Sequence, residues 1–239
     1  MNNRRTLIAA IVGGALILGA AGVGIIYFVV FAGSSPQKLA LSSPAPSSSA
    51  STSPDASAGA GTWTVGSGSQ AGYRVREKLA ALSAPSDAVG RTTAVTGTLT
   101  LTQAASGYSV TAADFSVDVS KLTSDQSRRD QRIHSQGLES DRYPIATFKL
   151  TSPIALTADA ASGQTIHVSA TGDLTIHGVT KSVTVPIDAQ LTGSKIELVG
   201  SITFPFSQFG MTPPSIGGFV SVENTATMEF QLLLTRQGA

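Results

Sequence analysis

Alternation of apolar and polar residues in the C-terminal half of the chain is the feature that most constrains its fold. From Ile166 to Ile176 every second residue is apolar or glycine, and the residues between them are His, Ser, Thr or Asp. Successive side chains of a β-strand point to opposite faces, so this pattern predicts a strand with one apolar and one polar face. The alternation resumes from Val183 to Leu191, and the link between them, His177–Thr180, predicts a hairpin turn.

The same period of two recurs along most of the chain beyond Gly61. It is found at positions 72–75, 95–101, 110–119, 196–202 and 228–234. Near Asp114 the apolar parity switches, which predicts a β-bulge or a strong bend. Long strands with one apolar face close most readily into a barrel or pack as a two-layer sandwich. We therefore expect an all-β domain, an antiparallel barrel of about eight strands with one or two short helices. A transmembrane barrel is disfavoured, because the domain lacks the aromatic girdles of such barrels.

The segment 124–136 is polar and lacks this alternation. Its first residue is Ser, a favoured N-cap residue, so we predict a short surface helix that begins there. The segment carries Arg128, Arg129 and Arg132. Arginine binds phosphate and carboxylate groups well, so these three are possible contacts for the head group of a ligand. The alternative is a salt-bridged turn that ties the helix to the sheet.

Residues 7–32 contain no charged side chain. As a helix they would be roughly 39 Å long, more than the roughly 30 Å of a bilayer's hydrocarbon core. Arg4 and Arg5 precede the run, and positive charge tends to stay on the cytoplasmic side. We therefore predict a cytoplasmic N-terminus at 1–6, a transmembrane signal-anchor helix at 7–32 and an extracytoplasmic remainder, which places the protein in the cell membrane. A signal peptide cleaved at Val30–Ala32 and a twin-arginine export signal are the alternatives.

Residues 33–61 are dominated by Ser, Ala and Pro and cannot bury enough apolar area to fold, so we predict a disordered linker there. Residues 62–239 remain for one domain. Three of the 16 Lys and Arg and one of the 15 Asp and Glu precede Gly61, so the domain is nearly neutral and nucleic acid is not expected as a partner. Since the chain has no Cys, disulfides and thiolate metal sites are excluded.

Aromatic residues gather in one stretch near the C-terminus. Phe204, Phe206, Phe209 and Phe219 lie in a segment interrupted by three prolines and three glycines. Such a segment is a poor continuous strand, and it predicts a loop or short helix that lays aromatic rings against the core. The rings either line a site for an apolar ligand or simply close one end of the barrel.

Signals for catalysis are weak. The three histidines, His134, His167 and His177, have no spacing typical of a metal site, and the chain has no phosphate-binding loop or nucleophile elbow. We expect no catalytic residue, no metal site and no cofactor, and therefore a protein that is not an enzyme.

Several motifs of the domain are similar to those of one known family. They are Trp63–Val65, Ser124–Asp130, Ala146–Phe148 after Pro144, Gly172–Lys181 and the aromatic segment Phe204–Phe219. On these residues the chain resembles the YceI-like family of polyisoprenoid-binding, lipocalin-like proteins. The resemblance implies a lipocalin-like barrel of eight antiparallel strands whose interior holds a long apolar chain.

With the membrane anchor, this resemblance implies an extracytoplasmic binding protein for an isoprenoid or other long-chain lipid. The candidate lining residues are Phe115, Phe148, Ile166, Val168, Leu174, Ile176, Val183, Val185, Phe204, Phe206, Phe209, Phe219, Met228 and Phe230. The alternative is an interaction module of the cell envelope with a filled core and no ligand. The oligomeric state is left open.

Overall fold

The computed structural model describes residues 35–42, 59–79, 86–192, 194–216 and 220–237. The predicted anchor at 7–32 lies outside these residues, as does most of the predicted linker. Within the part that is described, no helix has the length and hydropathy needed to cross a bilayer.

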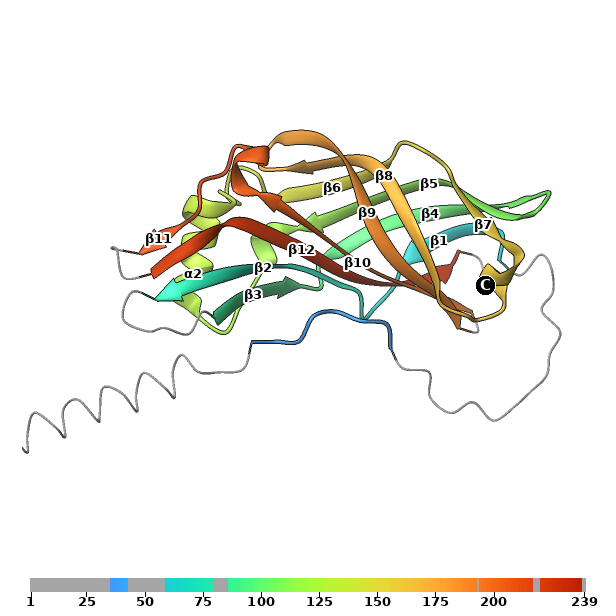
Figure 1. The fold of residues 1–239 in the computed structure, drawn as a ribbon, viewed down its shortest axis with the longest axis horizontal. Helices are drawn as coiled ribbons and strands as arrows, with labels where there is room; N and C mark the ends of the chain where they lie inside the picture. The colour runs from blue at the N-terminus through green and yellow to red at the C-terminus, as the bar shows by residue number, and fades with distance from the viewer. Residues whose placement is uncertain (1–34, 43–58, 80–85, 193, 217–219, 238–239) are drawn as a thin grey trace, which may run out of the picture. The chain divides into compact units, whose positions relative to one another are not determined.

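Most of the described residues lie in β-strands (Figure 1). The strands are β1 Gly61–Val65, β2 Gln70–Leu79, β3 Ser86–Thr92, β4 Val95–Ala104, β5 Gly107–Asp118, β6 Ile145–Leu150, β7 Ile154–Thr157, β8 Ile166–Ile176, β9 Val179–Thr192, β10 Lys195–Pro205, β11 Ser215–Ile216 and β12 Val220–Arg236. One short α-helix among the described residues, α2, spans Ser127–Arg132 and continues into a π-helical turn at Ile133–Gly137. The 3₁₀ turns are Val119–Lys121, Ala158–Ala161 and Phe206–Phe209.

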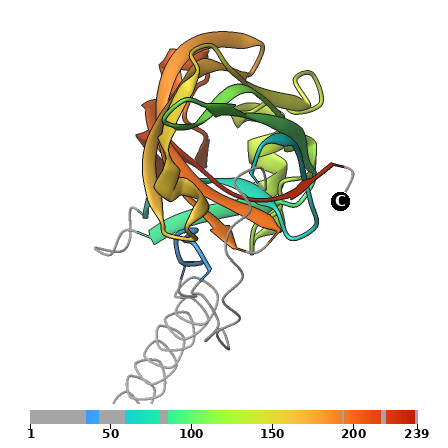
Figure 2. The same ribbon diagram turned by 90° about the vertical axis from the view of Figure 1, so that its right-hand side faces the viewer.

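Eight of the described strands close into an antiparallel barrel. Their order is β1-β4-β5-β6-β8-β9-β10-β12, and β12 pairs with β1 to complete the ring. Figure 2 shows the strands curving around this ring. The 17-residue strand β12 is long enough to pair with β1 near its end and with β2 over most of its length. Strand β3 then pairs with β2 and extends the sheet beyond the ring. The predicted all-β barrel is therefore confirmed.

Local features follow the sequence pattern closely. Strand β8 has the predicted limits, and the turn to β9 consists of His177 and Gly178. Both have positive φ, 54° and 71°, as a two-residue hairpin with primed turn geometry requires. The predicted irregularity near Asp114 is a bulge, in which Thr111 of β5 is the extra residue opposite β4.

The start of the helix differs from the prediction. Helix α2 begins at Ser127, and its N-cap residue makes no side-chain capping hydrogen bond. Ser124 instead donates from its backbone N–H and from its hydroxyl to Oδ1 of Asp130, at 2.9 and 2.6 Å. The Ser124 hydroxyl also accepts from the backbone N–H of Gln126, the N-cap residue, at 3.2 Å, so Ser124 lies three residues before the helix and binds the residue that precedes its first turn.

Two adjoining apolar clusters fill the barrel, one near α2 and one around Trp63. Trp63 is only 1% exposed, and its indole N–H donates to the carbonyl of Gly59 at 2.9 Å. This bond satisfies the one polar atom of the ring, so the whole side chain can be buried without an unpaired donor.

The substitution Gly97→Ala should lower the free energy of unfolding by about 2 kcal/mol or more. Gly97 has φ of 145°, and an added Cβ would lie 2.3 Å from the backbone oxygen of Asp114. Chemical denaturation measures the loss. Gly137→Ala is the matched control, because a Cβ there meets no atom within 4 Å. Equal stability of the two variants would contradict the prediction.

Candidate functional site

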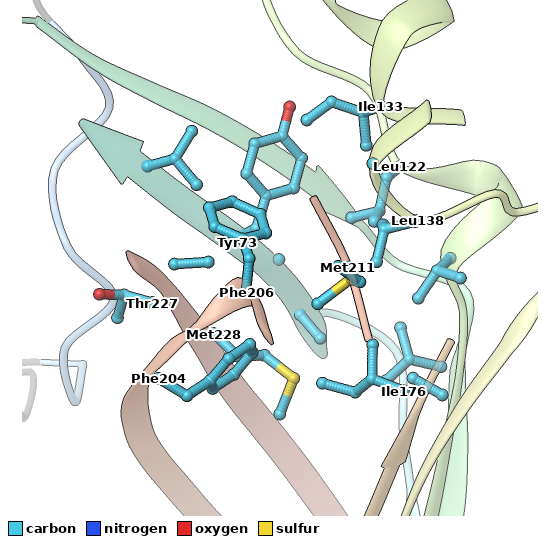
Figure 3. Close-up of a pocket in the computed structure, with 18 of the residues that line it drawn as sticks. Tyr73, Leu122, Ile133, Leu138, Ile176, Phe204, Phe206, Met211, Thr227 and Met228 are labelled. Carbon is cyan, nitrogen blue, oxygen red and sulfur yellow. The ribbon is translucent and has the colours of Figure 1, made fainter. Parts of the chain in front are cut away.

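The described residues enclose three apolar cavities along the inside of the barrel. Each has a volume of about 80 Å³. Cavity A lies next to the π-helical turn and the 3₁₀ turn Phe206–Phe209, and Figure 3 shows its lining. Cavity B is lined mainly from β5, β6, β9 and β12, and cavity C lies beside β7 and the turn Ala158–Ala161.

Neighbouring cavities share walls. Ala71, Val117, Ala146 and Met228 line both A and B. Ile187 and Leu198 line both B and C. The three cavities therefore form a row through the barrel, separated by a few side chains. Methionine has three rotatable bonds and adapts to irregular spaces, so Met228 is suited to move between A and B.

The linings are almost wholly apolar. Where polar residues occur, as with Thr227 in cavity A and Gln190 in cavity C, apolar atoms still provide nearly all of the exposed wall. Such walls offer dispersion and hydrophobic contacts and almost no hydrogen bonds. The space suits a hydrocarbon chain and excludes a strongly polar ligand.

Most of the predicted lining residues lie in these walls. Those that line a cavity are Ile176, Phe204, Phe206 and Met228 in A; Phe115, Phe148, Leu174, Val185, Met228 and Phe230 in B; and Ile166 and Val168 in C. Val183 and Phe209 are buried in the core cluster near α2 and line none of the three cavities. Phe219 lies outside the described residues. Which of these side chains contact a ligand stays a prediction.

The predicted arginine cluster is mostly engaged within the protein. Arg129 makes two bonds to the carboxylate of Glu77 on β2, at 3.2 and 3.1 Å, and also pairs with Asp125. Arg132 donates to the side-chain oxygen of Gln136 at 3.4 Å, and Arg128 is exposed. Arg129 thus ties α2 to the sheet, as the salt-bridge alternative expected. A head-group contact by any of the three stays a prediction.

The histidines are dispersed. His134 bridges the backbone oxygen of Leu122 and the hydroxyl of Ser140, at 3.0 and 2.6 Å. His167 is exposed and pairs with Asp188 across β8 and β9. Among the described residues no three His, Asp or Glu are placed to hold a metal ion.

The wall of cavity A includes residues that the alternation did not single out. They are Tyr73, Leu122, Ile133, Leu138 and Met211, with glycines at 72 and 137. Ile133 and Leu138 come from the segment after α2, whose polar composition gave no sign of an inward face. For Tyr73 a signal was available, since it lies in a predicted strand, two residues before Val75.

Tyr73 carries a buried hydroxyl at the edge of cavity A. Its oxygen has no hydrogen-bond partner within the described part of the chain, and Figure 3 shows it directed toward the side where Ile133 lies. Burial raises the pKa of Tyr73 well above the ordinary value of 10.0, against the lowering effect of the Arg129 charge.

Replacing Tyr73 by Phe should make the free energy of unfolding fall less steeply as the pH rises above about 10. Above about pH 10 the unfolded chain releases the phenol proton while the folded chain keeps it, so folding loses about 1.4 kcal/mol per pH unit from this group. Denaturation between pH 9 and pH 11 measures the slope. Tyr143→Phe, which removes the hydroxyl of a different tyrosine, is measured in parallel as the control variant. An unchanged slope in Tyr73→Phe would show that water reaches the hydroxyl.

Comparison with known proteins agrees with this geometry. The family model described as the YceI-like domain matches residues 63–234. A UPF0312 protein of Vibrio parahaemolyticus is 30% identical over 116 residues, which cover 45% of this chain and 57% of that protein. A UPF0312 protein of Vibrio campbellii is 37% identical over 79 residues, which cover 33% of this chain and 37% of that protein. The chain thus matches little more than half the length of the first of these relatives and less than half of the second.

Among solved structures, a polyisoprenoid binding domain from Saccharophagus degradans superposes with a TM-score of 0.54 at 13% identity. The superposition covers 74% of this chain and 99% of that domain, and at this identity it establishes a shared fold. The family match covers nearly the whole barrel and includes every strand of the closed ring in whole or in part. The chain therefore belongs to the YceI-like family.

Proposed function

We propose that this protein is a membrane-anchored, extracytoplasmic binding protein that holds an isoprenoid or other long-chain lipid inside its barrel. The observation that carries the proposal is the row of three apolar cavities with shared walls. The family membership and the fold shared with a polyisoprenoid binding domain support the choice of ligand class.

Binding of this kind needs no catalytic group. Each CH₂ group removed from water contributes about 0.8 kcal/mol, so a long chain gains much of its affinity from burial alone. A chain that occupies all three cavities must displace the side chains at the junctions, above all Met228. The protein in this proposal is a carrier or store and not an enzyme.

The membrane anchor is a separate part of the proposal. It rests on the uncharged run at 7–32 and on the arginines before it. Extraction of membranes with alkaline carbonate should leave the full chain in the pellet, and protease added to intact spheroplasts should digest the barrel. Release into the supernatant would instead support a cleaved signal peptide.

The ligand is tested by native mass spectrometry of the full chain, released from its own membranes in mild detergent. We expect one bound amphiphile per barrel, with a mass that solvent extraction and fragmentation assign to an isoprenoid or acyl lipid. The same chain, refolded without lipid, provides the reference mass. Barrels that are empty in every preparation would overturn the proposal and favour an envelope interaction module.

A further inference from the structure

Residues Gln37–Ser42, within the predicted linker, lie against the outside of the barrel. In Figure 1 this segment is the blue stretch of chain beside β2 and β3. A guanidinium N–H of Arg91 on β3 donates to the carbonyl of Gln37. The side-chain amide of Gln231 on β12 donates to the carbonyl of Ala40 at 3.1 Å. The segment is thus held through its backbone.

The end of the segment is held more firmly. Both the backbone N–H and the hydroxyl of Ser42 donate to Oε1 of Glu197 on β10, at 3.0 and 3.1 Å. The same oxygen accepts from the amide of Gln231 at 2.6 Å, and Gln70 on β2 donates to the other end of that amide at 3.0 Å. The segment therefore crosses from β3 over β12 to β10 on a connected set of polar side chains.

The strands beneath the segment carry buried charges on their outer face. Glu229 lies between Met228 and Phe230 and is, like them, one of the residues around cavity B. Its carboxylate pairs at 2.9 Å with Arg91 of β3, the strand that extends the sheet beyond the ring, so the charged end of the side chain lies on the outer face. Glu229 is nevertheless only 3% exposed. Lys38 and Leu39 line a groove together with Glu229. A carboxylate on the outer face is shielded from water only if other residues lie over it. Lys38 and Leu39 are among the residues that do so.

We propose that Gln37–Ser42 is a docking strap that fixes the barrel beside its membrane anchor. This inference rests on the proposed anchor at 7–32. Between Ala32 and Gln37 the chain can span at most about 18 Å. Residues 43–58 then join two points of the same domain and do not set its distance from the bilayer. The spacer between the predicted anchor and the docked barrel is then the short stretch after Ala32 and not the whole predicted linker.

Docking is tested with paired cysteines in the full chain, which has no Cys of its own. Leu39→Cys and Ser201→Cys place thiols on two residues that line the same groove. A short bismaleimide should link this pair about tenfold more efficiently than the control pair Leu39→Cys and Thr98→Cys, whose second thiol lies on β4, which borders β1 and β5 in the ring. Equal yields would overturn the docking. The test needs no ligand, so its failure leaves the lipid-binding proposal standing.

The second test measures how the distance from the barrel to the membrane changes when residues are inserted into the anchored chain. A Gly-Ser insertion of about 20 residues adds roughly 25 Å of mean reach to a free linker. Placed after Gly33, it should lower energy transfer from a fluorophore on the barrel to labelled lipid head groups by about half, since it lengthens the chain between the predicted anchor and the strap. Placed after Ser49, it should leave the transfer unchanged. A free tether would give the same loss at both positions, which would overturn the strap.

Discussion

Filling cavity A from Gly137 should remove most of the bound lipid while the barrel stays folded. Gly137 ends the π-helical turn and lines the cavity, and a Cβ at this position meets no atom within 4 Å. The variant Gly137→Leu therefore places four carbons into the cavity without a clash at the backbone. We expect the dissociation constant for lipid to rise about tenfold, which corresponds to about 1.4 kcal/mol of binding free energy, so that fewer barrels carry lipid at a fixed, limiting lipid concentration. Native mass spectrometry measures the fraction of barrels that carry lipid.

The matched control is Gly137→Ala, which changes the backbone preference in the same way and adds only a methyl group. It should bind lipid as the unmodified chain does. Both variants should unfold at the same denaturant concentration as the unmodified chain or higher, because filling a cavity commonly adds about 0.5–2 kcal/mol of stability. Full lipid content in a folded Gly137→Leu chain would show that the ligand does not use cavity A.

The barrel could be predicted from the sequence because apolar and polar residues alternate along its strands, and this alternation shows which side chains point inward. Successive side chains of β8 point alternately to the interior and to the surface. The alternation of apolar and polar residues alone predicted both ends of this strand. The same rule placed Phe115 and Met228 toward the inside, where they line cavity B, while Phe148 was predicted from the family resemblance. Parity does not say which inward residues leave space, so Val183 and Phe209 were indistinguishable in the sequence from residues that face a cavity.

Two features escaped prediction for a physical reason. The strap is held partly through the carbonyls of Gln37 and Ala40, and a backbone acceptor leaves no trace in the residue pattern. The wall formed by Ile133 and Leu138 depends on a π-helical turn after α2, which shifts the helical period within a short polar segment. In both cases the contact depends on partners distant in the sequence.

The buried outer charge at Glu229 should contribute strongly to stability. Arg91 pairs with its Oε1 at 2.9 Å and Arg74 with its Oε2 at 3.5 Å, while Arg74 also bonds Asp87 at 3.3 Å. The side chains of Glu229 and Arg74 are only 4% and 9% exposed. Removing the carboxylate leaves two guanidinium groups facing each other with little water. We therefore expect Glu229→Ala to lower the free energy of unfolding by about 3–5 kcal/mol.

Chemical denaturation of the full chain in mild detergent measures this loss, and two further variants separate its causes. Asp188→Ala removes an exposed carboxylate that pairs with His167 and should cost less than about 1 kcal/mol. Glu229→Gln keeps the shape and removes only the charge, so a cost close to that of Glu229→Ala would assign the effect to charge. Since Arg91 also holds the strap, Glu229→Ala should in addition reduce the crosslink from Leu39→Cys to Ser201→Cys. A small loss of stability with full crosslinking would show that the strap docks independently of the buried charge.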